Sequence, residues 1–485
     1  MSCSKIREAL TEVFMRLKLK TKIFYGIGGL GDSSLYNLFT NFMLFYLTTI
    51  VGIKPVAGGF IVAFGTIWEA LCGPFIGHFS DNYDSKYGNR KPFMLAAAIP
   101  IGICTSLLFT NINAAYSVKL VYYTIMVMVF WTLFSTFFIP YLSWGAELTR
   151  DYDERTALRS YSYVFDTVGM VVSMVVPTLC VDYFMNMGKS ASTSWQYMGI
   201  LVSIIGSLGI LLSAYNIKET DNPDYTKPVK RKSMSLDFAR EIFIEYKDLI
   251  NLKSLQYIIA ASMIYLIANA IAAGDRMYYF TYNMGYSGWK ITFLLLLFTC
   301  TGFVFTPIIN KLSAHWDKRI VYIGCMLLSA VLTIAFKFIG INGMSSMCIF
   351  LVQFSIGTTV YWQLIPAMLY DVCEVDMLSC GRDRTGSVVS LQAISEAVAE
   401  AVGAQSLGII LQIAGFNGEA AMQSATALAW VENSFAVIPA LLMIGSAYMI
   451  YKYPVSKRVY NDVVKAIESR EAGIMPDMKQ FENLM

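Results

Sequence analysis

Charged residues and histidines are scarce in this chain. Of its 485 residues, 15% are Asp, Glu, Lys or Arg and 56% are hydrophobic, whereas soluble domains carry about 25% charged residues. The two histidines, His78 and His315, lie far apart, and the nine cysteines form no Cys-x-x-Cys pair. This spacing predicts no zinc or haem site, and we expect the cysteines to be small packing residues. The net charge of +3 is too small to indicate binding to nucleic acid.

Enzyme signatures are also missing. We find no HExxH, GxSxG or GxxxxGK[ST] motif and no glycine-rich nucleotide fingerprint. We therefore expect no enzyme activity and no bound cofactor or metal. A chain without an ATP-binding loop can carry out uphill transport only by using an ion gradient, so H⁺ and Na⁺ are the candidate co-transported ions.

Long apolar stretches dominate the chain. About 20 apolar residues cross a hydrocarbon layer about 30 Å thick, and twelve stretches satisfy this requirement. They predict an all-α membrane protein with twelve transmembrane helices in two bundles of six. The stretches are Lys22–Val51, Val56–Ser80, Pro92–Asn111, Val118–Leu142, Thr156–Tyr183, Ser194–Tyr215, Ser254–Asn283, Lys290–Ser313, Ile320–Ile339, Met344–Tyr370, Thr385–Ala414 and Ala425–Tyr453.

Lysines and arginines gather on alternate turns, in the N-terminal segment and in the tail, which predicts a multi-pass protein of the cytoplasmic membrane with both termini in the cytoplasm. A polar, basic segment divides the helices six and six, and Ser235–Leu249 within it predicts an interfacial helix. Secondary transporters often have this plan, with the solute site near mid-membrane. The expected parts are residues 1–216 and 254–453 as bundles, 217–253 as linker, and 454–485 as a cytoplasmic tail.

Acidic side chains inside the apolar stretches are the main candidates for chemistry. A charge at the centre of a membrane helix costs at least about 2.5–3.5 kcal/mol, so it usually faces a cavity or a partner. Asp32 follows four glycines and can share a helix face with Tyr36, beside Asn37. Glu69 has no base near it in sequence, so we expect it to bind a proton or a cation, or to pair across helices. Further candidates are Asp166, Glu396, Glu400, and the neighbours Asp275 and Arg276, which could neutralise each other at a helix end.

The middle of the tenth stretch offers groups that suit a polyol. Trp362 and Gln363 lie beside Thr358 and Thr359. An aromatic face next to hydroxyls and amides can stack on a sugar ring and bond to its hydroxyls, although a tryptophan used only for packing would give the same pattern.

Several segments together resemble the glycoside-pentoside-hexuronide:cation symporter family of the major facilitator superfamily, over about Lys22–Asp462. They are Tyr25–Asn37, Ile67–Gly77, Asp84–Phe93, Ile139–Thr156 and Tyr370–Gly386. The resemblance implies a sugar, glycoside or sugar acid carried with a cation by alternating access. It places the last of these segments in the loop after the tenth helix.

The same resemblance assigns individual residues. A coupling carboxylate on the second helix maps to Glu69, while a second one falls on Gly73. A fourth-helix acid falls on Phe138, and a fifth-helix arginine falls on Ser162. One carboxylate in place of two favours H⁺ coupling or facilitated diffusion, and the lost arginine and acid favour a less polar ligand.

These arguments define three sets of candidates. The coupling set is Glu69, Asp32 and Glu396. The substrate set is Asp32, Tyr36, Asn37, Phe138, Tyr141, Ser162, Asp166, Trp362, Gln363 and Gln392. The gating set in the loops is Asp84, Arg90, Lys91, Arg155 and Arg384.

The predicted function is cation-coupled symport of a sugar-like solute by a monomer embedded in the lipid bilayer. Two alternatives remain open. One is a related carrier or facilitator of an amphipathic, non-sugar solute, which Phe137 and Phe138 favour. The other is a membrane receptor that binds a solute without transporting it.

Overall fold

The protein is described here by a computed structural model. The structure describes residues 17–83, 85, 87–149, 152–217, 244–382, 384–418, 420, 422–471, 478–481 and 483–484. Throughout these residues every regular element is a helix. The predicted all-α membrane fold is therefore confirmed.

The described residues fall into two compact units. The first draws on Met1–Ile53, Phe64–Ser233 and Ser287–Thr292, and the second on Lys54–Ala63, Met234–Tyr286 and Phe293–Met485. Each unit is described by itself below.

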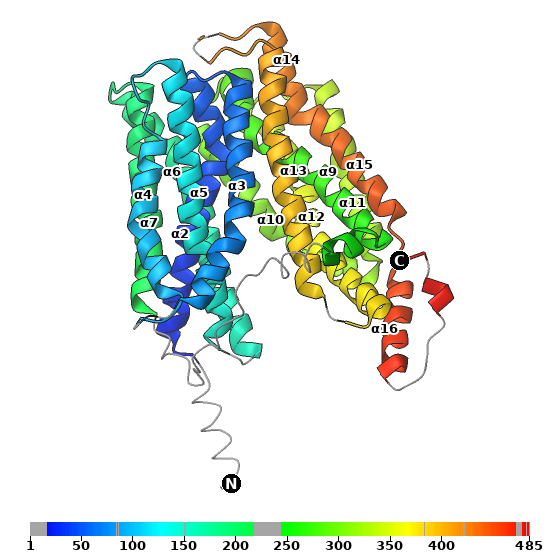
Figure 1. Ribbon diagram of the computed structural model, residues 1–485. Helices are drawn as coiled ribbons and strands as arrows, with labels where there is room; N and C mark the ends of the chain where they lie inside the picture. The colour runs from blue at the N-terminus through cyan, green and yellow to red at the C-terminus, as the bar shows by residue number, and fades with distance from the viewer. Residues whose placement is uncertain are drawn as a thin grey trace, which may run out of the picture. The chain divides into compact units, whose positions relative to one another are not determined.

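The first unit is a bundle built around α2 (Figure 1). Its helices are α2 (Leu19–Phe45, extended by a π-helical turn over Tyr46–Ile50), α3 (Pro55–Asn82, of which the residues up to Ala63 belong to the second unit), α4 (Lys91–Leu108), α5 (Tyr116–Glu147), α6 (Tyr152–Asn186) and α7 (Ala191–Asn216). α2 packs mainly against α6 and α7, and α4 packs against α5 and α7.

Glycines allow α2 to approach its neighbours this closely. A Cβ atom built on Gly31 would lie 2.7 Å from the carbonyl oxygen of Gly206 on α7, and one on Gly28 would lie 2.6 Å from the Tyr141 ring on α5. Small residues are used in this way where lipid provides no hydrophobic drive for helix association. The glycine run therefore sets the depth at which Asp32 is held.

The second unit has α9 at its centre. Its helices are α9 (Lys253–Tyr278, with a π-helical turn over Tyr279–Asn283), α10 (Trp289–His315, of which the residues up to Thr292 belong to the first unit), α11 (Lys318–Ile339), α12 (Met344–Cys380), α13 (Thr385–Ile413), α14 (Ala425–Glu432, followed by a π-helical turn over Asn433–Val437), α15 (Ile438–Lys452), α16 (Lys457–Glu471) and a 3₁₀ turn over Met478–Phe481. α9 packs against α12, α13 and α15.

Among the described residues, eleven helices are long and apolar enough to cross a membrane. They correspond to the second to twelfth predicted stretches. The first stretch is also a helix, α2, but its glycines, Asp32 and Asn37 make it less apolar than the others. All twelve predicted stretches are therefore helical. We expect the neighbouring helices to cover the polar face of α2.

The tenth helix is longer than predicted. It ends at Cys380 rather than Tyr370, so the segment from Tyr370 to Asp376 belongs to the last turns of α12 and not to a loop. The sequence has no glycine or proline between Pro366 and Gly381 to stop the helix. Gly381 does stop it, because it takes a left-handed conformation with φ 69° that favours glycine.

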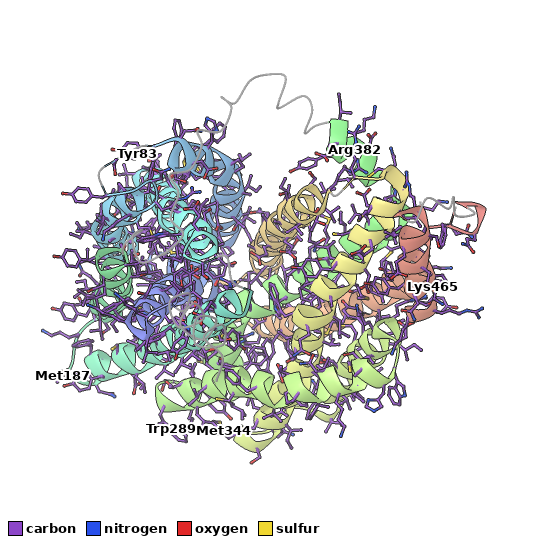
Figure 2. All side chains as sticks on the ribbon, turned by 90° about the horizontal axis from the view of Figure 1, so that it is seen from below. Tyr83, Met187, Trp289, Met344, Arg382 and Lys465 are labelled. Carbon is purple, nitrogen blue, oxygen red and sulfur yellow. The ribbon has the colours of Figure 1, made fainter. Side chains whose placement is uncertain are left out.

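The predicted interfacial helix over Ser235–Leu249 lies largely outside the described residues. Only its last part is described, where residues 244–250 are helical. The tail contains an element that the sequence analysis missed. α16 buries Val463 and Ala466 and presents Lys465 outward (Figure 2). Arg470 Nη1 donates a hydrogen bond of 3.0 Å to the carbonyl oxygen of Leu378 on α12.

We predict that Gly31→Ala lowers the thermal unfolding temperature of the purified protein in detergent. The added Cβ would press on the backbone of α7, and the neighbour that must yield is rigid. Gly324→Ala on α11 is the matched control, because a Cβ there meets nothing within 4 Å and alanine favours the helix by up to about 1 kcal/mol. Equal unfolding temperatures for the two variants would contradict the tight packing of α2.

Candidate functional site

A tyrosine pair organises the polar groups of the first unit. Tyr25 on α2 and Tyr141 on α5 stack with ring centroids 4.5 Å apart. The Tyr141 hydroxyl lies 2.9 Å from the carbonyl oxygen of Tyr25, to which it can donate, and 2.8 Å from the hydroxyl of Ser162 on α6. Ser162 in turn reaches Asp166 Oδ2 at 3.5 Å, one turn further along α6. Tyr141, Ser162 and Asp166, all predicted as substrate residues, are thus brought together.

The carboxylate of Asp166 faces α2. Its Oδ1 is buried, has no hydrogen-bond partner among the described residues, and lies against Gly29. Asp32 lies on α2, three residues after Gly29. It is half-buried and within electrostatic reach of Asp166 on α6. Two acidic groups from different helices therefore share one region of the first unit.

Arg159 supplies the positive charge of this region. Its guanidinium acts electrostatically on Tyr25, Asp32 and Asp166. The sequence analysis did not single out Arg159, which the structure places in the second turn of α6 at an exposed position. It lies three residues before Ser162, and so close to the face on which the resemblance expected an arginine. The signal was present, because Arg159 lies inside the predicted stretch Thr156–Tyr183, but the sequence analysis considered only the acids of that stretch as candidates.

The other predicted residues of the first unit form an aromatic wall. Tyr36 lies 5.8 Å, centroid to centroid, from both Trp131 and Phe134, and Phe134 stacks on Phe138 at 5.6 Å. Asn37 does not extend this wall, since its amide donates 2.9 Å to the carbonyl of Ser33 in its own helix. An aromatic surface therefore flanks the acidic region.

Glu69 on α3 is half-buried and belongs to a different set of neighbours. It acts electrostatically on Cys72, one turn later. Thr132 on α5 accepts a 2.9 Å hydrogen bond from Trp68 Nε1 and lies 3.9 Å from the Cys72 sulfur. Trp68 and Cys72 are thereby fixed on either side of Glu69 along α3.

A second polar cluster occupies the second unit. Gln392 Nε2 on α13 donates to Ser262 Oγ on α9 at 2.6 Å and to Glu396 Oε1 at 3.0 Å. The hydroxyl of Tyr361 on α12 lies 2.6 Å from Ser262 Oγ and donates to Glu396 Oε1 at 3.5 Å. Tyr361 stacks on Tyr265 of α9 at 4.1 Å. Ser262 and Tyr361 were not predicted, because serines and tyrosines recur throughout the apolar stretches and give no distinguishing signal.

Trp362 and Gln363 lie apart from this cluster. Successive residues of a helix point about 100° apart, so Trp362 is 50% exposed while Tyr361 is buried against α9. The Trp362 ring meets Tyr361 edge-on at 5.2 Å. Gln363 Oε1 is buried and has no hydrogen-bond partner among the described residues.

A charged cluster joins the ends of three helices of the first unit. Buried Arg90, just before α4, forms an ion pair with Asp81 at the end of α3 and another, 2.8 Å long, with Glu147 at the end of α5. It also donates 2.8 Å to Ser80 Oγ. Burial lowers the pKa of Arg90, but Glu147 and Asp81 raise it, and the net direction is upward. Arg90 therefore ties three helix ends together.

The other predicted gating residues are placed separately. Lys91 donates to the carbonyl oxygens of Tyr215 and Ile217 at 2.7 and 2.9 Å. Arg384 bonds Asp376 with Nε–Oδ2 3.0 Å, and this hydrogen bond raises the pKa of Arg384. Asp84 and the side chain of Arg155 lie outside the described residues.

The second unit repeats the arrangement of Arg90. Lys318 Nζ, in the first turn of α11, lies 2.7 Å from Asp371 Oδ2 on α12. In the first unit a base just before α4 pairs with an acid at the end of α5, so each unit uses one cation to join consecutive helices. Asp371 was expected in a loop; its place inside α12 is what gives it this partner.

The chain matches a protein family described as MFS/sugar transport protein over residues 24–457. It is 23% identical to an uncharacterised symporter of Synechocystis sp., covering 94% of this chain and 98% of the relative. It is also 23% identical to an isoprimeverose transporter of Lactiplantibacillus pentosus, over 89% and 88% of the two chains. A glucuronide carrier protein homolog of Escherichia coli is 20% identical, over 94% of this chain and 97% of the relative.

Solved structures share the fold. A xylose transporter from Escherichia coli superposes with a TM-score of 0.61 and 14% identity, covering 90% of this chain and 96% of that one. A structure of a proton dependent oligopeptide transporter gives a TM-score of 0.62 at 10% identity, covering 90% and 99%. At these identities the likeness shows the fold alone.

We predict that Arg90→Ala destabilises the protein by about 3 kcal/mol, because it leaves Asp81 and Glu147 close together without their cation. Thermal unfolding in detergent measures the loss. Arg90→Lys should recover only part of the lost stability. An ammonium lacks the planar fork with which the guanidinium bonds two carboxylates and a hydroxyl. Lys91→Ala, which removes a neighbouring cation that bonds the carbonyl oxygens of Tyr215 and Ile217 and lies over the Tyr215 ring, is the control. An Arg90→Ala protein as stable as Lys91→Ala would show that the cluster contributes no stability.

Proposed function

The chain belongs to the MFS/sugar transport protein family, and from this premise we propose that it couples the uptake of a sugar, a glycoside or a sugar acid to H⁺ or Na⁺ by alternating access. Membership in this family makes it a multi-pass membrane transporter and not an enzyme. It also favours transport over the receptor alternative.

The single observation that supports this proposal most is the group of Asp32, Asp166 and Arg159 in the first unit. Two acids held partly buried among apolar helices are costly unless a polar solute or ion uses them, and Arg159 adds a positive charge from an exposed position within electrostatic reach of both. The carboxylates can accept hydrogen bonds from sugar hydroxyls, and the guanidinium can donate them. The resemblance expects a fifth-helix arginine at the position of Ser162, and we propose that Arg159 fulfils its role.

Solute contacts are proposed in each unit. In the first unit they are Asp32, Tyr36, Tyr141, Ser162 and Asp166. In the second, Gln392 offers an unpartnered Oε1, and the half-exposed ring of Trp362 offers a stacking face. The solute is small and sugar-like.

Glu69 is our first choice for ion coupling and Glu396 the second, with Asp32 as the acid that links ion and solute. Gly73 stands where the family pattern has a second carboxylate beside Glu69. A single carboxylate provides fewer of the oxygen ligands that Na⁺ needs, whereas it can carry one proton. We therefore propose H⁺ as the coupling ion. The basic turns further support a cytoplasmic location for both termini.

The aromatic wall favours a second candidate, an amphipathic organic solute carried by the same route. Tyr36 and Phe138 are partly exposed on either side of the buried Phe134, and they offer apolar area that a polar ring alone would not need. Transport that no sugar competes with would select this candidate.

We predict that Glu69→Gln abolishes ion-driven accumulation of solute in proteoliposomes while leaving solute counterflow measurable. Glutamine keeps the size of the side chain but cannot bind and release a proton. Glu468→Gln makes the same change on an exposed position of α16 and should leave both activities intact. Full accumulation by the Glu69→Gln protein would exclude Glu69 as the coupling residue.

We also predict that Arg159→Gln weakens solute binding about tenfold, equivalent to about 1.4 kcal/mol, with little change in thermal stability. Arg159→Lys should restore part of the affinity, because it restores the charge near Asp32 and Asp166. Arg458→Gln, on the exposed side of α16, is the control. The measurement is equilibrium binding of labelled solute, and equal affinities in all three variants would contradict a role for Arg159 in binding.

A further inference from the structure

Asp275 and Arg276 are adjacent and buried in α9, yet they do not pair with each other. Asp275 Oδ2 accepts a 3.0 Å hydrogen bond from Ser434 in the π-helical turn after α14. The Arg276 guanidinium instead lies over the ring of Phe298 on α10, with Cζ 4.4 Å from the centroid. Neighbours on a helix point about 100° apart, which explains the divergence. The expected mutual neutralisation at a helix end is wrong.

Arg276 makes no ion pair with any residue that the structure describes, although only 5% of its surface is exposed. Attraction to one aromatic ring is weaker than the cost of removing a guanidinium from water. A buried cation is normally compensated by an anion. The described part of the protein does not supply that anion.

Two further polar groups lie in the same region. Tyr265 precedes Arg276 by three turns on one face of α9 and is within electrostatic reach of its guanidinium. The hydroxyls of Tyr265 and Thr358 are neighbours, and neither has another hydrogen-bond partner among the described residues. One cation and two hydroxyls are thus buried with unused hydrogen-bonding capacity.

We infer that Arg276, stacked on Phe298 and within electrostatic reach of Tyr265, binds an anionic group of the transported solute. A carboxylate or a phosphate has the oxygen spacing for two parallel bonds from a guanidinium. The hydroxyls can donate to its remaining oxygens. This inference rests on the proposed transport function and narrows it, since a neutral glycoside would leave Arg276 uncompensated.

The remaining part of such a solute would meet the second polar cluster. Tyr265 stacks on Tyr361, whose hydroxyl belongs to the network of Ser262, Gln392 and Glu396. Gln392 Oε1 in this network has no hydrogen-bond partner among the described residues. Sugar hydroxyls bonded there and an acidic group on Arg276 together describe a sugar acid or a sugar phosphate.

The first test measures stability without solute. Arg276→Met keeps the length and apolar volume of the side chain but removes the uncompensated charge, so the thermal unfolding temperature of the full-length protein should rise. If Arg276 served only to hold α9 against α10, the same change would lower it, and that result would overturn the inference. Arg382→Met is the control, because Arg382 is exposed beyond the end of α12 (Figure 2).

The second test measures anion binding. D-glucuronate or glucose 6-phosphate should raise the unfolding temperature of the wild-type protein more than D-glucose does, and Arg276→Met should abolish the difference. Arg276→Lys should keep a smaller difference, because it retains the charge without the planar stack. Comparison of the two anions distinguishes a carboxylate from a phosphate. An equal response to D-glucose, no response to either anion, or an unchanged preference in Arg276→Met would each overturn the inference. Solute counterflow in the same preparation would show separately whether the proposed transport function stands.

Discussion

Hydrocarbon cannot hydrogen-bond, and this constraint underlies the rest of the structure. Every polar group carried into an apolar helix must find its partner within the protein. The chain meets this requirement in part, by gathering hydroxyls and amides around carboxylates, and it leaves atoms such as Asp166 Oδ1 without a partner among the described residues. Tyr141 and Ser162 lead to Asp166 in the first unit, and Tyr361 and Gln392 hold Glu396 in the second. The polar clusters are therefore also the sites where a solute or ion can replace a missing partner.

The two clusters are built alike. In each, a tyrosine from α5 or α12 stacks on a tyrosine from α2 or α9, at 4.5 or 4.1 Å, and its hydroxyl bonds a serine. In each, an acid follows its amide or hydroxyl partner by one turn, on α6 or α13. The cations differ: Arg159 lies beside Asp32 and Asp166, whereas Arg276 has no carboxylate partner among the described residues. The units share a plan of construction but differ in charge.

Helix positions were predictable from the sequence because the length needed to cross a membrane is fixed by its thickness. Most predicted ends lie within a turn or so of the observed ones, and α12 differs because a membrane helix can continue into water until a residue such as Gly381 stops it. The candidate acids were predictable because charge is rare in apolar runs. Their partners were not, since Ser262 and Tyr361 resemble many other hydroxyl residues and Arg159 resembled a loop residue. Which groups meet depends on how helices distant in sequence pack.

Stability and function make opposite demands on Arg276. An ion pair with the neighbouring Asp275 would compensate the positive charge of Arg276. The helix instead directs the two side chains to different partners, and Ser434 donates a hydrogen bond to Asp275. Arg90 shows the other solution, in which two carboxylates and a serine surround one guanidinium. Arg90 shows that this chain can give a buried guanidinium a full set of partners. Packing alone therefore does not explain why Arg276 has no ion-pair partner among the described residues. The contrast supports the inference that the anion which compensates Arg276 is one that comes and goes, as a transported solute does.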